Sequence, residues 1–391
     1  MKHRLLTFLL FISFGLQAQY PTLSDQAEVS LITIGPGKYL YDCFGHNAFR
    51  VIDPSINMDR AYNYGSYDSF EDGFYVDFTL GTADYKLGVA DFDRFILSYQ
   101  RQNRWVKEQV MDLTQEEKQA IFEYLENNAR PENAYYRYDQ FFDNCATKLR
   151  DVPLEVLGDK LQFKADHLDR FFTMREMVDQ NSFNHPWIDL GIDIALGNII
   201  DRTATLEEHM YLPDYVFSGY ANASIERNGQ EIPIIKQTND LVITDFWERP
   251  VDKLQPWMVF AAIAIVVIFF TYKDYKLGKR TRSIDFGLFL FTGLIGALIL
   301  FLWFGTHHTT TVNNLNVLWA FAPNVVVAFY MLKKSPPKWT RVYARFLVIL
   351  MVLMTLVWVT KFQVFNVALL PMMLMFTFRY VFLWQKGLLK A

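Results

Sequence analysis

Residues 258–282 read MVFAAIAIVVIFFTYKDYKLGKRTR, a nearly unbroken apolar run followed by five basic residues within ten positions. The apolar part has the length and composition of a helix that crosses a lipid bilayer, allowing for tilt and for aromatic residues at the interface. Four more runs of this kind follow, at residues 286–304, 315–332, 346–359 and 364–383. Residues 257–385 are therefore predicted to form an α-helical membrane domain of five spans.

The charges between these runs predict which loops face the cytoplasm. Lys and Arg cluster after the first run and again at residues 333–341, whereas residues 305–314 and 360–363 hold one Lys and no Arg. Because basic residues concentrate in cytoplasmic loops, the loops after the first and third runs are expected inside, as is the C-terminus. Arg379, near the cytoplasmic end of the last run, is expected to snorkel to the membrane surface.

The N-terminus has the features of an export signal. Residues 1–4 are basic, residues 5–16 form an apolar stretch of signal-peptide length, and Ala18 offers a small residue for cleavage. Residues 1–18 are therefore predicted to be a signal peptide, the alternative being an uncleaved anchor helix. Either way residues 19–250 leave the cytoplasm, in agreement with the loop charges. The prediction is a multi-pass protein of the bacterial inner membrane with its exported domain on the periplasmic face.

Composition excludes several classes of protein. The chain has 391 residues, of which 51% are hydrophobic, and a formal net charge of -4. It is too apolar for a disordered chain and too neutral to bind nucleic acid through a basic field. Two cysteines exclude a disulfide-rich scaffold, and the sequence has no HExxH motif and no Cys/His cluster with zinc spacing. No cofactor and no metal are expected, and the oligomeric state stays open.

The exported residues 19–250 are typical of an α+β domain. Short β-branched segments that alternate in polarity predict strands at residues 29–34, 48–52, 60–64 and 105–113. A capping box at residues 114–117 predicts a helix to about Ala129. Two further helices are predicted, one beginning near Asn144 and one over residues 168–179.

Cys145 stands in the stretch Asp143-Asn144-Cys145-Ala146-Thr147-Lys148, where Asn144 or Asp143 can cap a helix. A thiol at a helix N-terminus lies at the positive end of the helix dipole, which favours the thiolate, and the free N–H groups there can hold an oxyanion. His46 follows a glycine near the start of a predicted strand. A histidine on a strand facing a cysteine at a helix start is the arrangement of a papain-like thiol site, here with the histidine first.

Other interpretations of these residues remain open. Cys145 can be a buried packing residue, or it can form a disulfide with Cys43, which an exported protein permits. Spacing alone favours these two interpretations over a nucleophile. Arg150 and Asp151 can pair with each other, and the aromatic cluster at residues 135–142 fits a packed core better than an acyl-chain groove.

The segments around both residues carry longer motifs. They are CFGHNAFRV at 43–51, YNYG at 62–65, and Tyr136-x-Tyr138 leading into NCATKLRD at 144–151, and further matching residues are His308, Asn314-Leu315-Asn316, Trp319 and Pro323. Together these motifs resemble the Lnb-type lipoprotein N-acyltransferase family. The order of His and Cys also resembles permuted papain-like acyltransferases, including the lecithin:retinol acyltransferase group. The resemblance implies an α+β permuted papain-like periplasmic domain followed by the helical membrane domain.

The same resemblance implies a reaction. An acyl chain would move from the sn-2 position of the diacylglyceryl group to the amine of the lipoprotein's N-terminal cysteine, through a thioester on Cys145 and with His46 as the base. Diacylglyceryl-modified lipoproteins and membrane lipid are then the expected partners. Asn63 is the candidate to orient the imidazole, because its strand could lie beside that of His46, although a turn or edge-strand amide explains it at least as well. Substrate-binding or supporting roles are expected for Asn144, Tyr64, Arg150, Asp151 and His308.

Two other functions fit the same residues. A membrane-tethered thiol hydrolase of the cell envelope, a peptidase or an amidase, would share the nucleophile and differ only in the acceptor. A non-enzymatic envelope scaffold would instead bridge Cys43 and Cys145.

Overall fold

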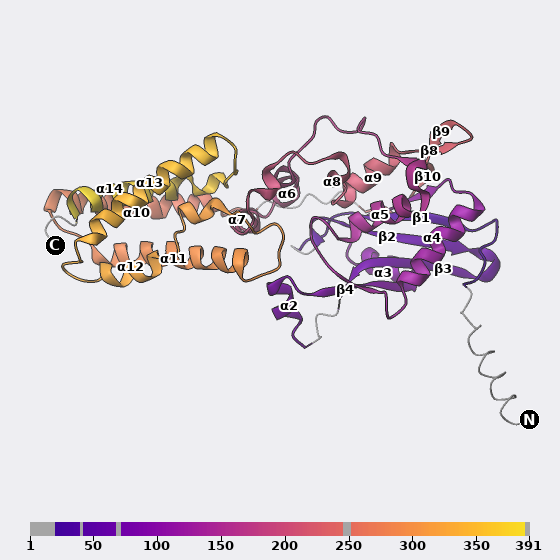
Figure 1. Cartoon of the computed structure of the whole chain (residues 1–391), viewed down its shortest axis with the longest axis horizontal. Helices are drawn as coiled ribbons and strands as arrows, with labels where there is room; N and C mark the ends of the chain where they lie inside the picture. Colours follow the sequence, from indigo (N-terminus) through magenta and orange to yellow (C-terminus); the bar gives the residue numbers. More distant parts are fainter. Residues whose placement is uncertain (1–19, 40–41, 68–71, 245–251, 388–391) are drawn as a thin grey trace, which may run out of the picture.

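The computed structural model describes residues 20–39, 42–67, 72–244 and 252–387 (Figure 1). The predicted signal peptide at 1–18 lies outside the described residues. Residues 20–244, called here the N-terminal domain, combine a sheet with helices, and residues 252–387, called the helical domain, form a bundle. Figure 1 shows the two lying end to end.

A seven-stranded antiparallel sheet forms the centre of the N-terminal domain, in the order β10-β5-β1-β2-β3-β4-β6. The strands are β1 (Glu28–Ile34), β2 (His46–Asp53), β3 (Met58–Ser66), β4 (Asp84–Asp91), β5 (Val106–Met111), β6 (Tyr135–Arg137) and β10 (Ile235–Val242). The four predicted strands correspond to β1, β2, β3 and β5. The inner strand β4 and the two edge strands β6 and β10 were not predicted.

Helices cover both faces of this sheet. Because side chains alternate along a strand, Phe49 and Tyr62 point to one face and Ala48 and Ala61 to the other. The first face packs against α4 (Gln115–Asn128) and α5 (Cys145–Leu157), and the second against α3 (Phe92–Arg101). Both predicted helix starts are confirmed: α4 follows the capping box of Thr114, and α5 begins at Cys145.

The N-terminal domain also contains a small sheet of β7 (Leu161–Gln162), β8 (Ser224–Arg227) and β9 (Gln230–Pro233), and the helices α2 (Phe74–Leu80), α6 (Met174–Ser182), α7 (Pro186–Ala195), α8 (Leu206–His209) and α9 (Pro213–Ala221). Of these remaining elements, α6 and α7 lie toward the helical domain, whereas β8 and β9 lie at the opposite end of the N-terminal domain (Figure 1). The helix predicted over 168–179 is wrong in its first half. Thr173 forms a capping box with Glu176, so α6 starts only at Met174.

Within the described residues, four helical segments are long and apolar enough to cross a membrane. They are Pro256–Leu277 (α10), Arg282–Phe304 (α11), Trp339–Val359 (α13) and Val367–Lys386, which includes α14 (Leu370–Phe382). The predicted span at 315–332 is not one helix. It consists of a 3-10 turn, Leu315–Leu318, and the short helix α12 (Asn324–Met331).

This broken segment runs along α11 from one end of the bundle to the other. At its start, the Asn314 side chain donates to the carbonyl of Ile194 in the N-terminal domain at 2.8 Å. At its far end, Arg282 donates to the carbonyl of Leu332 at 3.0 Å. A Cβ atom on Gly296 of α11 would lie 2.0 Å from the carbonyl oxygen of Ala320, so only glycine permits this close packing.

Arg379 corrects the expectation of snorkelling. Its side chain is fully buried and donates to Asp274 at 2.9 Å and to Asp285 at 2.7 Å. A charge within an apolar bundle is costly unless it is paired, and carboxylates from α10 and α11 provide the pairing. Arg379 therefore ties three helices together.

Candidate active site

The sheet opens where β2 and β3 reach α5. The ladder between these strands ends at the pair Phe49–Tyr62, and the chain continues to His46 on one side and Gly65 on the other. Gly65 has a φ of +84°, and a Cβ atom there would lie 3.9 Å from the Cβ of Cys145. Cys145, the first residue of α5, therefore lies at this opening, between the ends of the two strands.

Three of the predicted residues meet at this opening. The His46 ring hydrogen-bonds the Cys145 side chain, and its Nε2 atom lies 2.5 Å from Oδ1 of Asn63. Because Nε2 is engaged by Asn63, Nδ1 is the ring nitrogen left for the sulfur. The three side chains form a line from thiol to imidazole to amide, which is the geometry of an activated nucleophile with its base and an orienting group.

The electrostatics favour a charged pair. Burial alone raises the pKa of the Cys145 thiol, but the His46 charge, the His46 hydrogen bond and the N–H groups of Asn47 and Ala146 outweigh it, so the pKa lies below its ordinary value. Burial likewise lowers the pKa of His46, while the Cys145 thiolate and hydrogen bonds to Cys145 and Asn63 raise it overall. The pair can therefore exist as thiolate and imidazolium.

Asn144 holds the start of α5. Its Oδ1 atom accepts from the N–H groups of Ala146 at 2.8 Å and Thr147 at 2.9 Å, and its amide donates to the carbonyl of Tyr211 at 2.9 Å. This corrects the expectation that the N–H groups at the helix start are free to hold an oxyanion. The N–H of Cys145 itself is the one that the cap leaves for this task.

Four further residues lie near the pair, of which Tyr136 and Tyr138 belong to the motifs quoted above and Tyr99 and Arg104 had no predicted role. The Tyr138 ring stands beside Gly65, with Cε2 3.5 Å from the position of a Cβ there, and Tyr136 places its hydroxyl 4.0 Å from the same point. Tyr99 lies near the His46 ring at a centroid distance of 6.3 Å, and the buried Arg104 lies over the Tyr99 ring. The sequence carries no local signal for Tyr99 and Arg104, since packing of α3 against the sheet brings them in.

Other predicted residues hold the domain together. The Tyr64 hydroxyl donates to Asn128 at 2.6 Å within the core, away from solvent. Arg150 and Asp151 pair with each other at 2.6 Å, and Arg150 also donates to the carbonyl of Glu207. The structure therefore shows partners within the domain for these three residues, and their predicted supporting role in the site stays a prediction.

The proposed disulfide is wrong. Cys43 and Cys145, both buried in the described part of the chain, are not bridged to each other. The scaffold interpretation depended on that bridge and loses its main support.

His308 lies where the two domains meet. The His308 ring is 3.2 Å from the carbonyl of Thr79 at the end of α2, and the N–H of His307 donates to the carbonyl of Leu80 at 2.8 Å. The Asn316 amide donates to the carbonyl of Asp193 on α7 at 3.0 Å. Residues of the helical domain that carried the sequence resemblance thus fasten it to the N-terminal domain.

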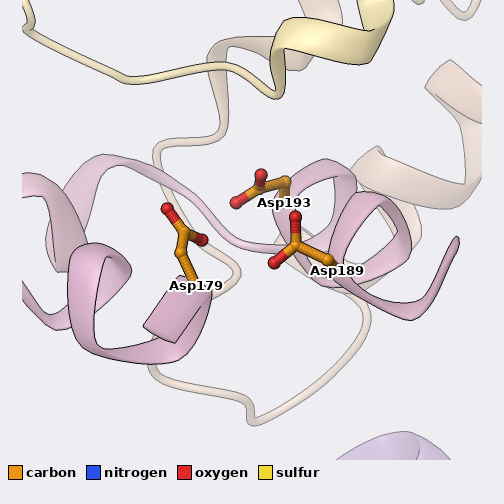
Figure 2. A group of neighbouring side chains, drawn as sticks. All are labelled: Asp179, Asp189 and Asp193. Atoms are coloured by element: carbon orange, nitrogen blue, oxygen red, sulfur yellow. The ribbon is translucent and has the colours of Figure 1, made fainter. Parts of the chain in front are cut away.

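A cluster of carboxylates forms part of the same joint. Figure 2 shows Asp179 facing Asp189 and Asp193 across the space between α6 and α7, and one oxygen of each lies within 4.8 Å of the others. This grouping could hold a cation by distance alone. The Asn366 amide donates to both Asp189 and Asp193 at 2.9 Å, and Arg175 pairs with Asp193 at 2.5 Å. These bonds make Asp189 and Asp193 part of a polar connection between the domains, whereas Oδ1 of Asp179 is buried with no hydrogen bond among the described residues.

Comparison with known proteins gives two matches to family models. Residues 17–180 match the Lnb N-terminal periplasmic domain, and residues 248–387 match the Lnb transmembrane domain. No curated protein and no solved structure matches the chain. The matches and the four apolar helices indicate an inner-membrane protein whose N-terminal domain is periplasmic. The chain therefore belongs to the Lnb-type family, whose domains indicate enzymes of lipoprotein modification.

Proposed function

We propose that the protein is a lipoprotein N-acyltransferase. It takes the acyl chain from the sn-2 position of the diacylglyceryl group and transfers it to the α-amine of the lipoprotein's N-terminal cysteine, which leaves a lyso-form lipoprotein. The observation that carries the proposal is the hydrogen-bonded pair of His46 and Cys145 at the start of α5, with Asn63 on the far side of the imidazole. Such a pair performs acyl transfer through a thioester.

In the first half of the reaction, the Cys145 thiolate attacks the carbonyl carbon of the ester. The N–H of Cys145 stabilises the oxyanion, assisted by the Tyr136 hydroxyl, to which nothing among the described residues is hydrogen-bonded. The carbon–oxygen bond then breaks. The His46 imidazolium gives its proton to the leaving glyceryl oxygen, and the acyl chain remains on the sulfur as a thioester.

In the second half, the lipoprotein amine attacks the thioester carbonyl. Neutral His46 takes the proton of the amine, the carbon–sulfur bond breaks, and an amide is formed while Cys145 returns to the thiolate. Asn63 acts as a positioning residue in both halves, because its bond to Nε2 keeps Nδ1 directed at the sulfur. No step requires a cofactor.

The membrane attachment supports a lipid substrate. A diacylglyceryl ester lies close to the outer face of the inner membrane, and bonds such as His307 to Leu80 hold the N-terminal domain against the helical domain at that level. We propose five crossings, with the broken segment from Asn314 to Leu332 as the third, because its ends reach opposite ends of the bundle. In this division residues 19–250 contain the catalytic residues, and residues 257–385 anchor the protein in the membrane.

The test uses the full-length protein in nanodiscs with a synthetic diacylglyceryl lipopeptide. Mass spectrometry of the peptide is expected to show one acyl chain moved from oxygen to nitrogen with no change in mass, and N-terminal sequencing chemistry is expected to find the amine blocked. Cys145→Ser and His46→Ala should each abolish the transfer. Cys43→Ser is the matched control, since it alters the other buried cysteine and should retain activity.

Two outcomes would contradict the proposal. Full activity of Cys145→Ser would remove the nucleophile. Release of free fatty acid with an unmodified amine would instead indicate the hydrolase.

A further inference from the structure

A cavity of about 450 Å³ lies where the two domains meet. Its walls come from α2, from the segment that includes Tyr138, and from the loop at residues 307–310 of the helical domain. This is the size of sites that bind small molecules or parts of larger ones. The mechanism above does not use this cavity.

The cavity adjoins the sulfur through a single side chain. Tyr138 lines the cavity, and its ring also stands beside Gly65, the residue that approaches Cys145. Tyr138 stacks on Tyr85, another lining residue, at a centroid distance of 4.3 Å. A molecule in the cavity would therefore lie behind the tyrosine that borders the reacting atoms.

Several of the polar side chains that line the cavity already have partners within the protein. Asp139 accepts from Thr309 at 2.6 Å, and Arg137 pairs with Asp84 at 3.1 Å. The His308 ring lies 3.2 Å from the carbonyl of Thr79. The lining also includes apolar and aromatic surface from Phe78, Ala83, Tyr85, Tyr138 and Phe142, beside the polar side chains of Gln140, His307 and Thr310. The apolar part of this lining suits hydrocarbon.

One wall of the cavity continues to the membrane surface. The short helix α2 exposes Tyr75, Val76 and Phe78 by 70%, 61% and 43%. Its end is bonded to His307, three residues after the end of the apolar helix α11, and Figure 1 shows α2 beside that end of the bundle. Exposed aromatic and aliphatic side chains at this level fit the boundary between headgroups and acyl chains.

We propose that this cavity binds the acyl chain that is transferred, both on the lipoprotein and on the Cys145 thioester. The chain enters from the outer leaflet along α2, passes Phe78 and lies against Tyr138, which brings its ester to the sulfur. This inference rests on the proposed acyl transfer. It identifies the cavity and the exposed side chains of α2 as the surfaces that contact the acyl chain of the substrate.

The first test locates the chain without needing turnover. In the inactive Cys145→Ser protein in nanodiscs, Phe78 or Phe142 is replaced by the photoreactive p-benzoylphenylalanine, and a dipalmitoyl lipopeptide is added before illumination. Mass spectrometry is expected to find adducts on the palmitoyl chains. Phe171, which is exposed to a similar extent as Phe78 (45% against 43%), is the control position and should give none. Equal adducts at Phe171, or adducts on bilayer phospholipid alone, would overturn the proposal.

The second test reads chain length in the active protein. Ala83 is buried in the cavity wall, and Ala83→Phe would fill part of the space. Transfer of palmitoyl chains is expected to fall about tenfold relative to octanoyl chains, since a shorter chain needs less of the cavity. An unchanged ratio with unchanged activity would overturn the assignment of the cavity while leaving acyl transfer intact. Absence of transfer in the unmodified protein would refute the proposed function, and the crosslinks would still report whether the cavity holds a chain.

Discussion

The Nε2 atom of His46 lies 2.5 Å from Oδ1 of Asn63, so an amide on β3 fixes the imidazole that faces Cys145. Replacing Asn63 by Ala should lower the kcat of acyl transfer by about 10- to 100-fold and leave KM nearly unchanged, because the amide acts through the imidazole. Steady-state kinetics with the lipopeptide measure both constants.

A structural role for Asn63 would give a different pattern. Asn63→Asp keeps an acceptor for the imidazole and should restore part of the activity lost in Asn63→Ala. Asn128→Ala removes an amide oxygen that accepts from Tyr64 on the other face of the sheet, and should leave kcat unchanged. Equal losses in Asn63→Ala and Asn63→Asp would contradict the positioning role.

The reactivity of Cys145 should persist below the pH at which an ordinary thiol ionises. The pKa of Cys145 is lowered, so the thiolate is present above that lowered value and is lost only as the pH falls through it. In a Cys43→Ser protein, alkylation by iodoacetamide at about pH 6 should therefore be faster than that of a free thiol of pKa about 8.5.

Removing the imidazole should shift this profile. In His46→Ala the desolvation by burial is no longer opposed by the His46 charge, so the pKa of Cys145 should rise and alkylation near pH 6 should fall at least about tenfold. The same profile in both proteins would show that His46 does not stabilise the thiolate.

Tyr136 and Tyr64 offer a matched pair for testing the oxyanion. Their rings meet edge to face at 6.0 Å, yet the Tyr64 hydroxyl donates to Asn128, whereas that of Tyr136 is buried with no bond among the described residues. Tyr136→Phe should lower kcat by about 10- to 100-fold. This decrease is smaller than the decrease expected when a hydrolase loses its main oxyanion donor. Tyr64→Phe should lower thermal stability and leave kcat intact. A Tyr136→Phe protein with full kcat would leave the N–H of Cys145 as the sole donor.

Local patterns were enough to predict the centre of the N-terminal domain. Alternating β-branched residues gave β1, β2 and β3, and the Thr114 capping box gave α4, because both signals depend on residues a few positions apart. A helix cap and a strand start suggested the pairing of Cys145 with His46, and the family resemblance favoured it over the packing and disulfide interpretations. Asn63 followed from the expectation that its strand lies beside that of His46, which the sheet order confirms.

What the sequence did not reveal depends on distant contacts. Hydropathy predicts an unbroken span at 315–332. It carries no information on Gly296, which allows the non-helical segment around Ala320 to pack closely against α11. Arg379 was expected at the membrane surface, since its partners Asp274 and Asp285 are about a hundred residues away in the chain. Tyr138 reaches the site because the edge strand β6 pairs with β4, and neither strand was predicted.

The carboxylates at the domain joint should make stability depend on pH. Burial raises the pKa of Asp179 to about 8, with added contributions from Asp193 and Asp189 and from the more distant Asp201, while Arg175 opposes the shift. A carboxyl whose pKa is raised on folding holds its proton more tightly in the folded state. Its stabilising contribution is therefore complete below its ordinary pKa of 3.8 and is lost as the pH rises through about 8.

Asp179→Asn should remove this dependence, because the amide stays neutral at every pH. The variant should melt a few degrees higher than the unmodified protein at pH 8 and above, and the difference should shrink toward pH 5, as measured by thermal unfolding in nanodiscs. Asp189→Asn is the contrasting variant: it weakens the bonds from Ser182 and Asn366 and should lower stability throughout the range. If the Asp179→Asn protein loses stability above pH 8 in parallel with the unmodified one, another group controls the joint. If it gains stability there, the charge that Asp179 carries above pH 8 is what destabilises the folded protein.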